Sequence, residues 1–326
     1  MATGGAPMKT LKFYSCLAKP IQNFINLRRL SGTDYQGQAQ LLGYFDRFVF
    51  EQGIKTPLMT QQITDHYLNS LSQLAPRTRL NRFCVVRQLC QYLAQNDPLN
   101  YIPEPLKTTP ARGHRQPYIY TLSEIQILME AASTLPPENT LRPHTYQTLL
   151  GLLYSTGIRI GEALALNLEH FHHTNSRLYI AEGKFRKARW VPLSISTCTA
   201  LERYLVRRTQ IKPYSPDSAL FINNRSRRLH QCAVHETFYC LLKKCQIPHN
   251  KHTGPRIHDF RHSFAVHRLL AWYRDGQDVN ARLAWLSTYM GHVDIHSTQV
   301  YLQPTAELIE QVNHRFHNHY LNQIKK

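Results

Sequence analysis

The chain has 326 residues, enough for two domains that each bury a core. Its 39 Lys and Arg residues against 21 Asp and Glu residues give a formal net charge of +18, and its hydrophobic fraction of 42% is ordinary for a globular protein. The lack of a long apolar run argues against a membrane partner, and seven cysteines without a C-x-x-C pair argue against a disulfide framework or a zinc finger. The first ten residues lack the apolar core of a signal peptide, so a cytoplasmic location is expected.

The charge is basic along the whole chain. Residues 1–110 hold 12 basic and 6 acidic side chains, and the remaining residues hold 27 and 15. Nucleic acid is the most common partner of such a charge, because each Lys or Arg placed on a phosphate releases a condensed counterion. A basic protein without a nucleic-acid partner is the alternative.

Residues 1–20 are expected to form an irregular basic leader, and 21–105 a helical DNA-binding domain. Helical spacing predicts helices over 36–52, 60–74 and 76–95. The last of these carries a core stripe and four arginines, which are either phosphate contacts or a solvated rim: Arg77, Arg79, Arg82 and Arg87. Prolines crowd the stretch that follows, so we place a linker at 106–117 and a second domain, with a C-terminal tail, at 118–326.

The second domain opens with a capping box, Thr121 and Glu124, before an apolar helix. Pro136, Pro137 and Pro143 predict a loop, which a helix over 144–154 follows. A short helix reaching residue 166, a β-hairpin around 178–191 and a further strand over 219–223 come next. Helices are predicted over 196–209, 231–245, 258–274, 279–290 and 305–321, so the fold is mainly α with a small β-hairpin or sheet.

Five short boxes stand in a fixed order in this second part. They read STGIRIGE (155–162), GKFRKARWVPL (183–193), HDFRHSFA (258–265), MGH (290–292) and TQVY (298–301). Together they offer arginines, lysines and histidines ahead of a late tyrosine. This set suits attack of a tyrosine hydroxyl on a DNA phosphate whose oxygens are held by cations.

The boxes resemble those of the tyrosine recombinase (phage integrase) family over residues 117–305, and imply an N-terminal helical bundle followed by an α+β catalytic domain. By this resemblance Arg159 and Arg261 bind the scissile phosphate and His258 transfers a proton. His292 donates to a phosphate oxygen, Tyr301 is the nucleophile and Lys184 is the general acid. Phe185 and Arg186 depart from the usual hairpin turn, so Lys187 competes with Lys184 for this role. DNA binding through a backbone phosphate is the alternative for Lys187 and for Lys184.

Glu162 either orients Arg159 or is a solvated helix carboxylate. A phenol is only about a thousandth ionised at neutral pH, and the cations of the boxes supply the stabilisation that phenolate needs. We therefore expect no cofactor and no metal ion. A zinc site on His258 and His262 is the alternative, although the glutamate of an H-E-x-x-H motif is missing.

The expected function is site-specific recombination of double-stranded DNA through a 3′-phosphotyrosyl intermediate, by a homotetramer on paired sites, with accessory proteins as additional partners. The long leader, the 134–143 loop and the unusual hairpin turn favour a mobile-element enzyme over a Xer-type chromosome-dimer resolvase. A type IB topoisomerase-like enzyme, a non-enzymatic DNA-binding protein and a metal-dependent nuclease are further alternatives.

Overall fold

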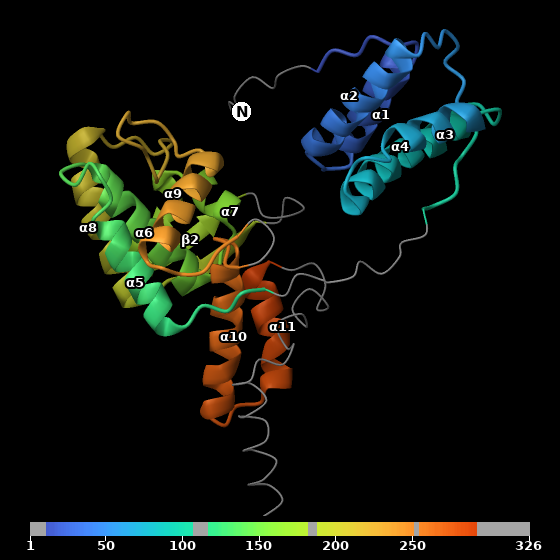
Figure 1. Cartoon of the computed structure of the whole chain (residues 1–326). Coiled ribbons are helices and arrows are strands. Elements are labelled where there is room, and N and C mark those ends of the chain that lie inside the picture. Colours follow the sequence, from blue (N-terminus) through green and yellow to red (C-terminus); the bar gives the residue numbers. More distant parts are fainter. Residues whose placement is uncertain (1–10, 107–116, 182–187, 251–253, 292–326) are drawn as a thin grey trace, which may run out of the picture. The chain divides into compact units, whose positions relative to one another are not determined.

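The structure is a computed structural model that describes residues 11–106, 117–181, 188–250 and 254–291. The chain divides into two compact units, residues 1–114 and 115–326 (Figure 1). The described part is mainly helical with one small sheet, which confirms the expected fold class. None of its helices is both long and apolar enough to cross a bilayer.

Within its described residues, the first unit has four helices around one apolar core. They are α1 (Ala18–Leu30), α2 (Gln36–Glu51), α3 (Gln61–Ser70) and α4 (Pro76–Asn96). Helix α4 begins with a proline at its first position, where no intrahelical amide donor is needed, and packs against α1 and α2. Its buried residues repeat at three- and four-residue steps, as the predicted stripe requires.

Helix α1 was not predicted, and it includes the last residues of the expected leader. Ile21, Phe24 and Ile25 bury one face of it. The preceding residues are tied to α2 by the buried carboxylate of Asp46, which accepts hydrogen bonds from the backbone amides of Tyr14 (2.7 Å) and Ser15 (3.1 Å). The chain is therefore ordered into the core several residues before the predicted start.

The second unit is built around helix α6 (Leu141–Thr156), which packs against α5 (Leu122–Ser133), α8 (Ile195–Ile211) and α10 (Asp259–Arg274). Nine residues of α6 are buried, so the helix is surrounded by other elements and does not bury one face only. Short helix α7 (Ile160–Ala165) follows it after a tight turn, and α9 (Gln231–Lys244) packs on α5 and α7. Helices α10 and α11 (Val279–Met290) form a pair with its own apolar cluster (Figure 1).

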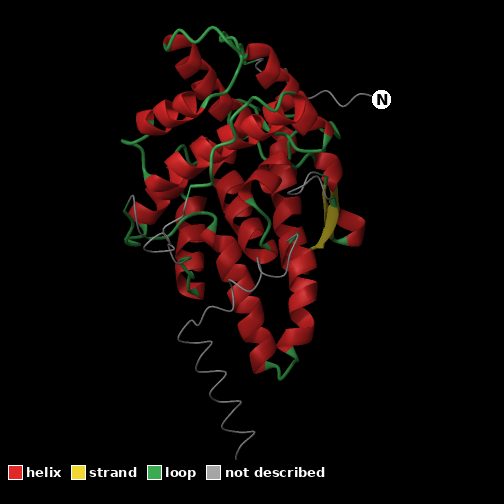
Figure 2. Ribbon diagram, turned by 90° about the vertical axis from the view of Figure 1, so that its right-hand side faces the viewer, coloured by secondary structure: helices red, strands yellow, loops and turns green. Residues whose placement is uncertain are grey.

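A three-stranded antiparallel sheet completes this unit and lies at the edge of the helices (Figure 2). Its strands are β1 (Phe171–His172), β2 (Arg177–Ile180) and β3 (Arg189–Pro192). Leu178 pairs with Val191 and Ile180 with Arg189, so these four side chains share one face. Leu178, Ile180 and Val191 are buried there, which places Arg189 on the inward side.

Two predictions about this unit were wrong. The expected strand at 219–223 forms only isolated bridges, from Ala219 to Asn167 and from Ile222 to Arg228. Pro143 lies inside the first turn of α6 and not in a loop, because the first turn of a helix makes no use of the amide that proline lacks. The helix predicted at 305–321 lies outside the described residues.

Candidate active site

Three of the six residues assigned by resemblance to catalysis lie in the described part: Arg159, His258 and Arg261. They stand where the ends of α6, α7, α10 and α11 meet. Lys184, His292 and Tyr301, together with the competing Lys187, lie outside the described residues.

Arg159 is positioned by the turn between α6 and α7. Gly157 ends α6 in the left-handed conformation, with φ of +61°, and Arg159 is the N-terminal cap residue of α7. A Cβ atom on Gly157 would lie 2.4 Å from Cδ1 of Phe264, so α10 packs directly on this turn. Only glycine fits both the dihedral angle and the contact.

Glu162 fixes Arg159 from one helical turn away. Its carboxylate accepts from the Arg159 backbone amide (2.9 Å) and from Nη1 of the same residue (2.8 Å). Glu162 is only 7% exposed, so it is not a solvated helix carboxylate. Burial alone would raise its pKa, but hydrogen bonds and charge from Arg189 and Arg159 lower it to about 2.

Arg261 lies in the first turn of α10 and is 2% exposed. Its Nη1 donates to the Gly157 carbonyl and its Nη2 to the Met290 carbonyl, each at 2.6 Å. The guanidinium therefore joins the last residues of α6 and α11. Because Arg159 Nη2 donates to the neighbouring Gly291 carbonyl at 3.3 Å, both arginines are anchored on the same helix end.

His258 caps α10 one residue before the buried Asp259, which accepts hydrogen bonds from the backbone and guanidinium of Arg256. The His258 ring reaches the surface, yet the protein packed around it disfavours its charged form and lowers its pKa, and Arg261 acts in the same direction. A neutral imidazole beside two arginines is able to accept a proton at neutral pH.

His262 lies one turn further along α10, with its ring centroid 5.3 Å from that of His258. Burial lowers the pKa of His262 to about 4, and the neighbouring His258 acts in the same direction. Within the described ranges, no group of three or more His, Cys, Asp or Glu side chains is placed to hold a metal ion.

Arg189 is a site residue that sequence reasoning missed. Its Nη1 and Nη2 donate to the two oxygens of Glu162 at 3.1 and 2.8 Å, and its Nε donates to the Tyr289 carbonyl at 3.0 Å. The sequence held a signal: Arg189 lies two residues before the inward-facing Val191 and so on the same face of the strand. A charge on the inner face of a strand needs a buried partner.

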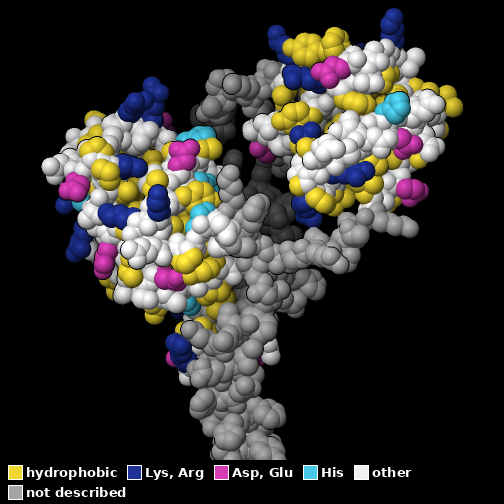
Figure 3. All heavy atoms as spheres, viewed as in Figure 1, with side chains coloured by type: hydrophobic (Ala, Val, Ile, Leu, Met, Phe, Trp, Pro, Cys, Tyr) yellow, Lys and Arg dark blue, Asp and Glu magenta, His cyan; other side chains and the backbone are white. Residues whose placement is uncertain are grey.

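The four arginines proposed as DNA contacts differ in their surroundings. Arg77 is exposed, and the guanidinium of Arg82 lies 4.2 Å from the centre of the Tyr44 ring. Arg79 is half-buried, and Arg87 donates to the Pro103 carbonyl at 2.8 Å, which fastens the segment after α4 to that helix. On the face shown in Figure 3, Lys and Arg side chains are spread over each unit and do not form one patch.

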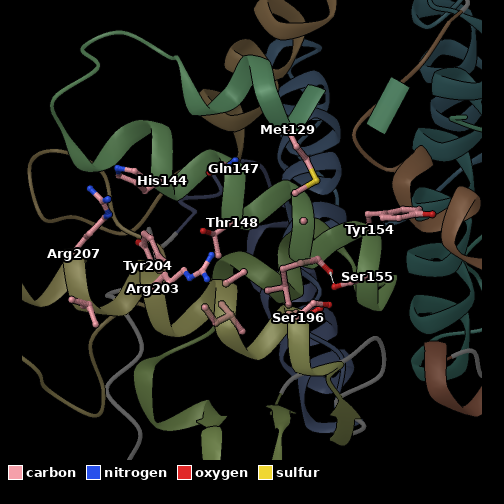
Figure 4. Close-up of a pocket in the computed structure, with 16 residues that line it drawn as sticks. Met129, His144, Gln147, Thr148, Tyr154, Ser155, Ser196, Arg203, Tyr204 and Arg207 are labelled. Carbon is pink, nitrogen blue, oxygen red and sulfur yellow. Dashed lines mark hydrogen bonds between the residues drawn. The ribbon is translucent and has the colours of Figure 1, made fainter. Parts of the chain in front are cut away.

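A separate cavity of about 720 Å³ lies between α6 and α8 (Figure 4). His144, Arg203 and Arg207 line one end, and Ser155 and Ser196 the other. None of its described lining residues is acidic, and neither Arg159 nor Arg261 belongs to it. It is therefore distinct from the arginine cluster, which consists of Arg159, Arg189 and Arg261 with Glu162.

Comparison with known proteins identifies the family. Residues 120–307 match the model of the phage integrase family. A Sinorhizobium fredii protein designated integrase/recombinase y4rB is 35% identical over 92% of this chain and 97% of its own, and the tyrosine recombinase XerC of Myxococcus xanthus is 29% identical over 82% and 86%.

Solved structures share the fold. The integrase of transposon Tn1549, bound to transposon right end DNA, has a TM-score of 0.66 with 16% identity over 92% of this chain and 98% of its own. The XerH recombinase bound to its difH substrate has a TM-score of 0.60 with 19% identity over 92% and 84%. The family model covers more than half of the chain, and the two relatives match along most of their own length. This protein therefore belongs to the phage integrase family of tyrosine-type site-specific recombinases.

Proposed function

We propose that the chain cuts and rejoins double-stranded DNA at specific sites, with Tyr301 as the nucleophile and a 3′-phosphotyrosyl bond as the intermediate. The observation that carries this proposal is the placement of Arg159 and Arg261 on one helix end, with His258 beside Arg261. Two fixed guanidiniums are able to hold the non-bridging oxygens of one phosphate and stabilise the charge of its transition state.

The cleavage step follows from these roles. The Tyr301 oxygen attacks the phosphorus in line while His258, neutral at pH 7, accepts the phenolic proton. Lys184 gives a proton to the departing 5′ oxygen. A 5′ hydroxyl of a second duplex then attacks the phosphotyrosyl phosphorus and gives its proton to the neutral Lys184, while His258 returns a proton to the departing Tyr301 oxygen. One phosphodiester bond replaces another, so the reaction needs no ATP. Because the cations of the site stabilise the charge of the transition state, the reaction also needs no metal ion.

A trapping experiment tests the nucleophile. The chain is incubated with a target duplex, selected from a random library by binding, that is nicked so that the 5′ hydroxyl diffuses away after cleavage. A covalent adduct at Tyr301, identified by mass spectrometry and lost in Tyr301→Phe, is expected. Tyr289→Phe is the matched control, because Tyr289 lies beside the arginines and burial raises the pKa of its hydroxyl to about 12. An adduct in Tyr301→Phe would refute the assignment.

The general acid is tested by leaving-group chemistry. A duplex with a bridging 5′ sulfur at the scissile phosphate needs no proton on its leaving group. Lys184→Ala is expected to lose cleavage of the normal duplex and regain it on the sulfur duplex. If Lys187→Ala is the variant that is rescued, the general acid is Lys187.

We assign DNA binding outside the cleavage site to the first unit, through Arg77, Arg79 and Arg82 on α4. Arg77 is the best placed of these because it is exposed. Replacing it with alanine should weaken binding uniformly across sequences and reduce the dependence of affinity on salt by about one counterion. An unchanged salt dependence would remove Arg77 from the interface.

We further propose that the enzyme serves a mobile element in the cytoplasm and acts as a tetramer on two paired sites. The similarity to an integrase/recombinase over 92% of the chain supports this more than the weaker similarity to XerC. The test is the product: excision should give a circular element and a rejoined flank, and the synaptic complex should have the mass of four chains and two duplexes. Resolution of chromosome dimers at a terminus site would instead identify a Xer-type enzyme.

A further inference from the structure

Arg189 joins three parts of the second unit that are far apart in the sequence. It belongs to β3, the strand that follows Lys184 in the chain, and it grips both oxygens of Glu162 on α7. Its Nε holds the Tyr289 carbonyl near the end of α11, and a Cβ atom on Gly291 would lie 2.9 Å from its Nη1. The guanidinium thus packs tightly between a strand and two helices.

Arg159 and Arg189 share a single carboxylate. Oε1 of Glu162 accepts from both guanidiniums, while Oε2 accepts from Nη2 of Arg189 and from the backbone amide of Arg159. Arg189 therefore has the two-pronged contact, and the Arg159 guanidinium has only one contact with Glu162. The remaining Arg159 donors are directed elsewhere, one of them to Gly291.

The two arginines also differ in exposure. The side chain of Arg159 is 23% exposed, that of Arg189 12% and that of Glu162 5%. Arg159 is therefore the more exposed of the two arginines. A phosphate that approaches from solvent finds more of the Arg159 side chain than of the Arg189 side chain accessible.

We propose that Arg189 is a positioning residue for strand cleavage: by occupying both oxygens of Glu162, it keeps Arg159 from closing a two-pronged pair with that carboxylate and leaves the Arg159 guanidinium free for the scissile phosphate. This inference rests on the proposed role of Arg159. Without Arg189, Oε2 of Glu162 would lose its guanidinium donor. The Arg159 guanidinium would then rotate to donate to this oxygen. The donors that face the phosphate would then turn inward.

The effect on catalysis should be large and specific. A displacement of about 1 Å in a positioned group can cost about 100-fold in rate, so Arg189→Gln should slow covalent adduct formation by about that factor. The affinity for the duplex should stay within about threefold of wild type, because most phosphate contacts lie elsewhere. A loss confined to the rate distinguishes positioning from a general loss of binding.

Arg177→Gln is the matched control. Arg177 lies on β2 in the same sheet, but on the outer face, where its guanidinium stacks 4.1 Å from the centre of the Trp190 ring. Arg177 has the same side chain and lies in the same sheet, but it does not contact Glu162. The Arg177→Gln variant should therefore cleave DNA at the wild-type rate.

The experiment compares a normal duplex with one whose scissile phosphate carries a methyl group in place of a non-bridging oxygen, tested as both diastereomers. The methylphosphonate is neutral and needs less help from a cation. Arg189→Gln should therefore lose about 100-fold on the normal duplex but less than about tenfold on the better methylphosphonate. Arg159→Lys should show the same pattern. If Arg189→Gln is unfolded at the assay temperature, Arg189→Lys, which keeps the charge but not the fork, is measured in its place.

The outcomes separate the two proposals. If Arg189→Gln loses the same factor on both duplexes, or cleaves as fast as Arg177→Gln, the positioning role of Arg189 is overturned. The loss of cleavage in Arg159→Lys would still support the catalytic role of Arg159. Wild-type cleavage by Arg159→Lys would overturn both.

Discussion

Replacement of Gly157 by alanine should destabilise the second unit and disturb the arginine cluster together. The backbone at Gly157 has φ of +61°, a conformation that costs a residue with a Cβ atom about 1–2 kcal/mol. The new methyl group would lie 2.4 Å from Cδ1 and 2.9 Å from Cγ of Phe264, and overpacking of this kind costs about 1–3 kcal/mol. The expected loss is about 2–5 kcal/mol, a large share of the stability of a typical domain.

Tryptophan fluorescence, excited at a wavelength that tyrosine does not absorb, measures this loss during urea denaturation. The chain has three tryptophans, Trp190, Trp272 and Trp285, and all belong to the second unit, so the signal reports that unit alone. Because Gly157 supplies the carbonyl that holds Arg261, DNA cleavage should fall as well, even at temperatures where the variant is folded.

Two comparisons make the prediction refutable. Gly161→Ala changes an exposed glycine inside α7 with nothing within 4 Å of the new atom, and should stabilise the unit by up to about 1 kcal/mol. With Phe264 shortened to leucine, Gly157→Ala should cost only the dihedral strain of about 1–2 kcal/mol. A cost in that background equal to the cost in wild type, or no cost in either, would refute the packing argument.

Three further predictions concern buried polar groups. Since the pKa of Glu162 falls from 4.5 to about 2 on folding, it should contribute about 3 kcal/mol above pH 5 that is lost as the pH falls toward 2; urea denaturation of Glu162→Gln should show a shallower fall over that range. Arg208, fully buried, donates to the carbonyls of Ala219 and Leu220, so Arg208→Met should lower the unfolding free energy of the second unit by about 2–4 kcal/mol in the same assay. Asp46→Asn should remove acceptors at the start of the first unit, and hydrogen exchange should accelerate across residues 14–30 while peptides of the second unit are unchanged.

Local patterns predicted much of the helical structure. The apolar stripe of α4 predicts a helix over 76–95, one residue short of its end, and the spacing of Val279, Leu283 and Met290 gives the bounds of α11. The capping box of Thr121 and Glu124 is present in α5, with both of its hydrogen bonds. These features depend on residues within a few positions of each other, which a sequence displays directly.

Elements that depend on distant partners were missed. Helix α1 has no side-chain cap, and the chain before it is fixed by Asp46, which lies 31 residues after Ser15. The apolar run at 219–222 suggests a strand, but Arg208 and not a neighbouring strand satisfies the carbonyls of Ala219 and Leu220. The periodicity of apolar residues indicates which positions are buried, but it does not identify the hydrogen-bond partners of the backbone groups.

The same distinction applies to the site. Motif order singles out Arg159 and Arg261, and the structure places both on the carbonyls that end α11. The pairing of Arg189 with Glu162 spans 27 positions, and the sequence offers no means of choosing that carboxylate among the others. Burial of both partners, visible only in the folded chain, determines the choice.

The convergence of α6 and α11 on the arginines has a consequence for substitution. The carboxyl end of a helix carries a partial negative charge, and two such ends here face the place proposed for an anion. Arg261 offsets this negative charge, because Nη1 and Nη2 of its planar guanidinium donate to the two carbonyl oxygens. A lysine ammonium lacks this planar fork, so Arg261→Lys should lose the geometry that joins the two helix ends.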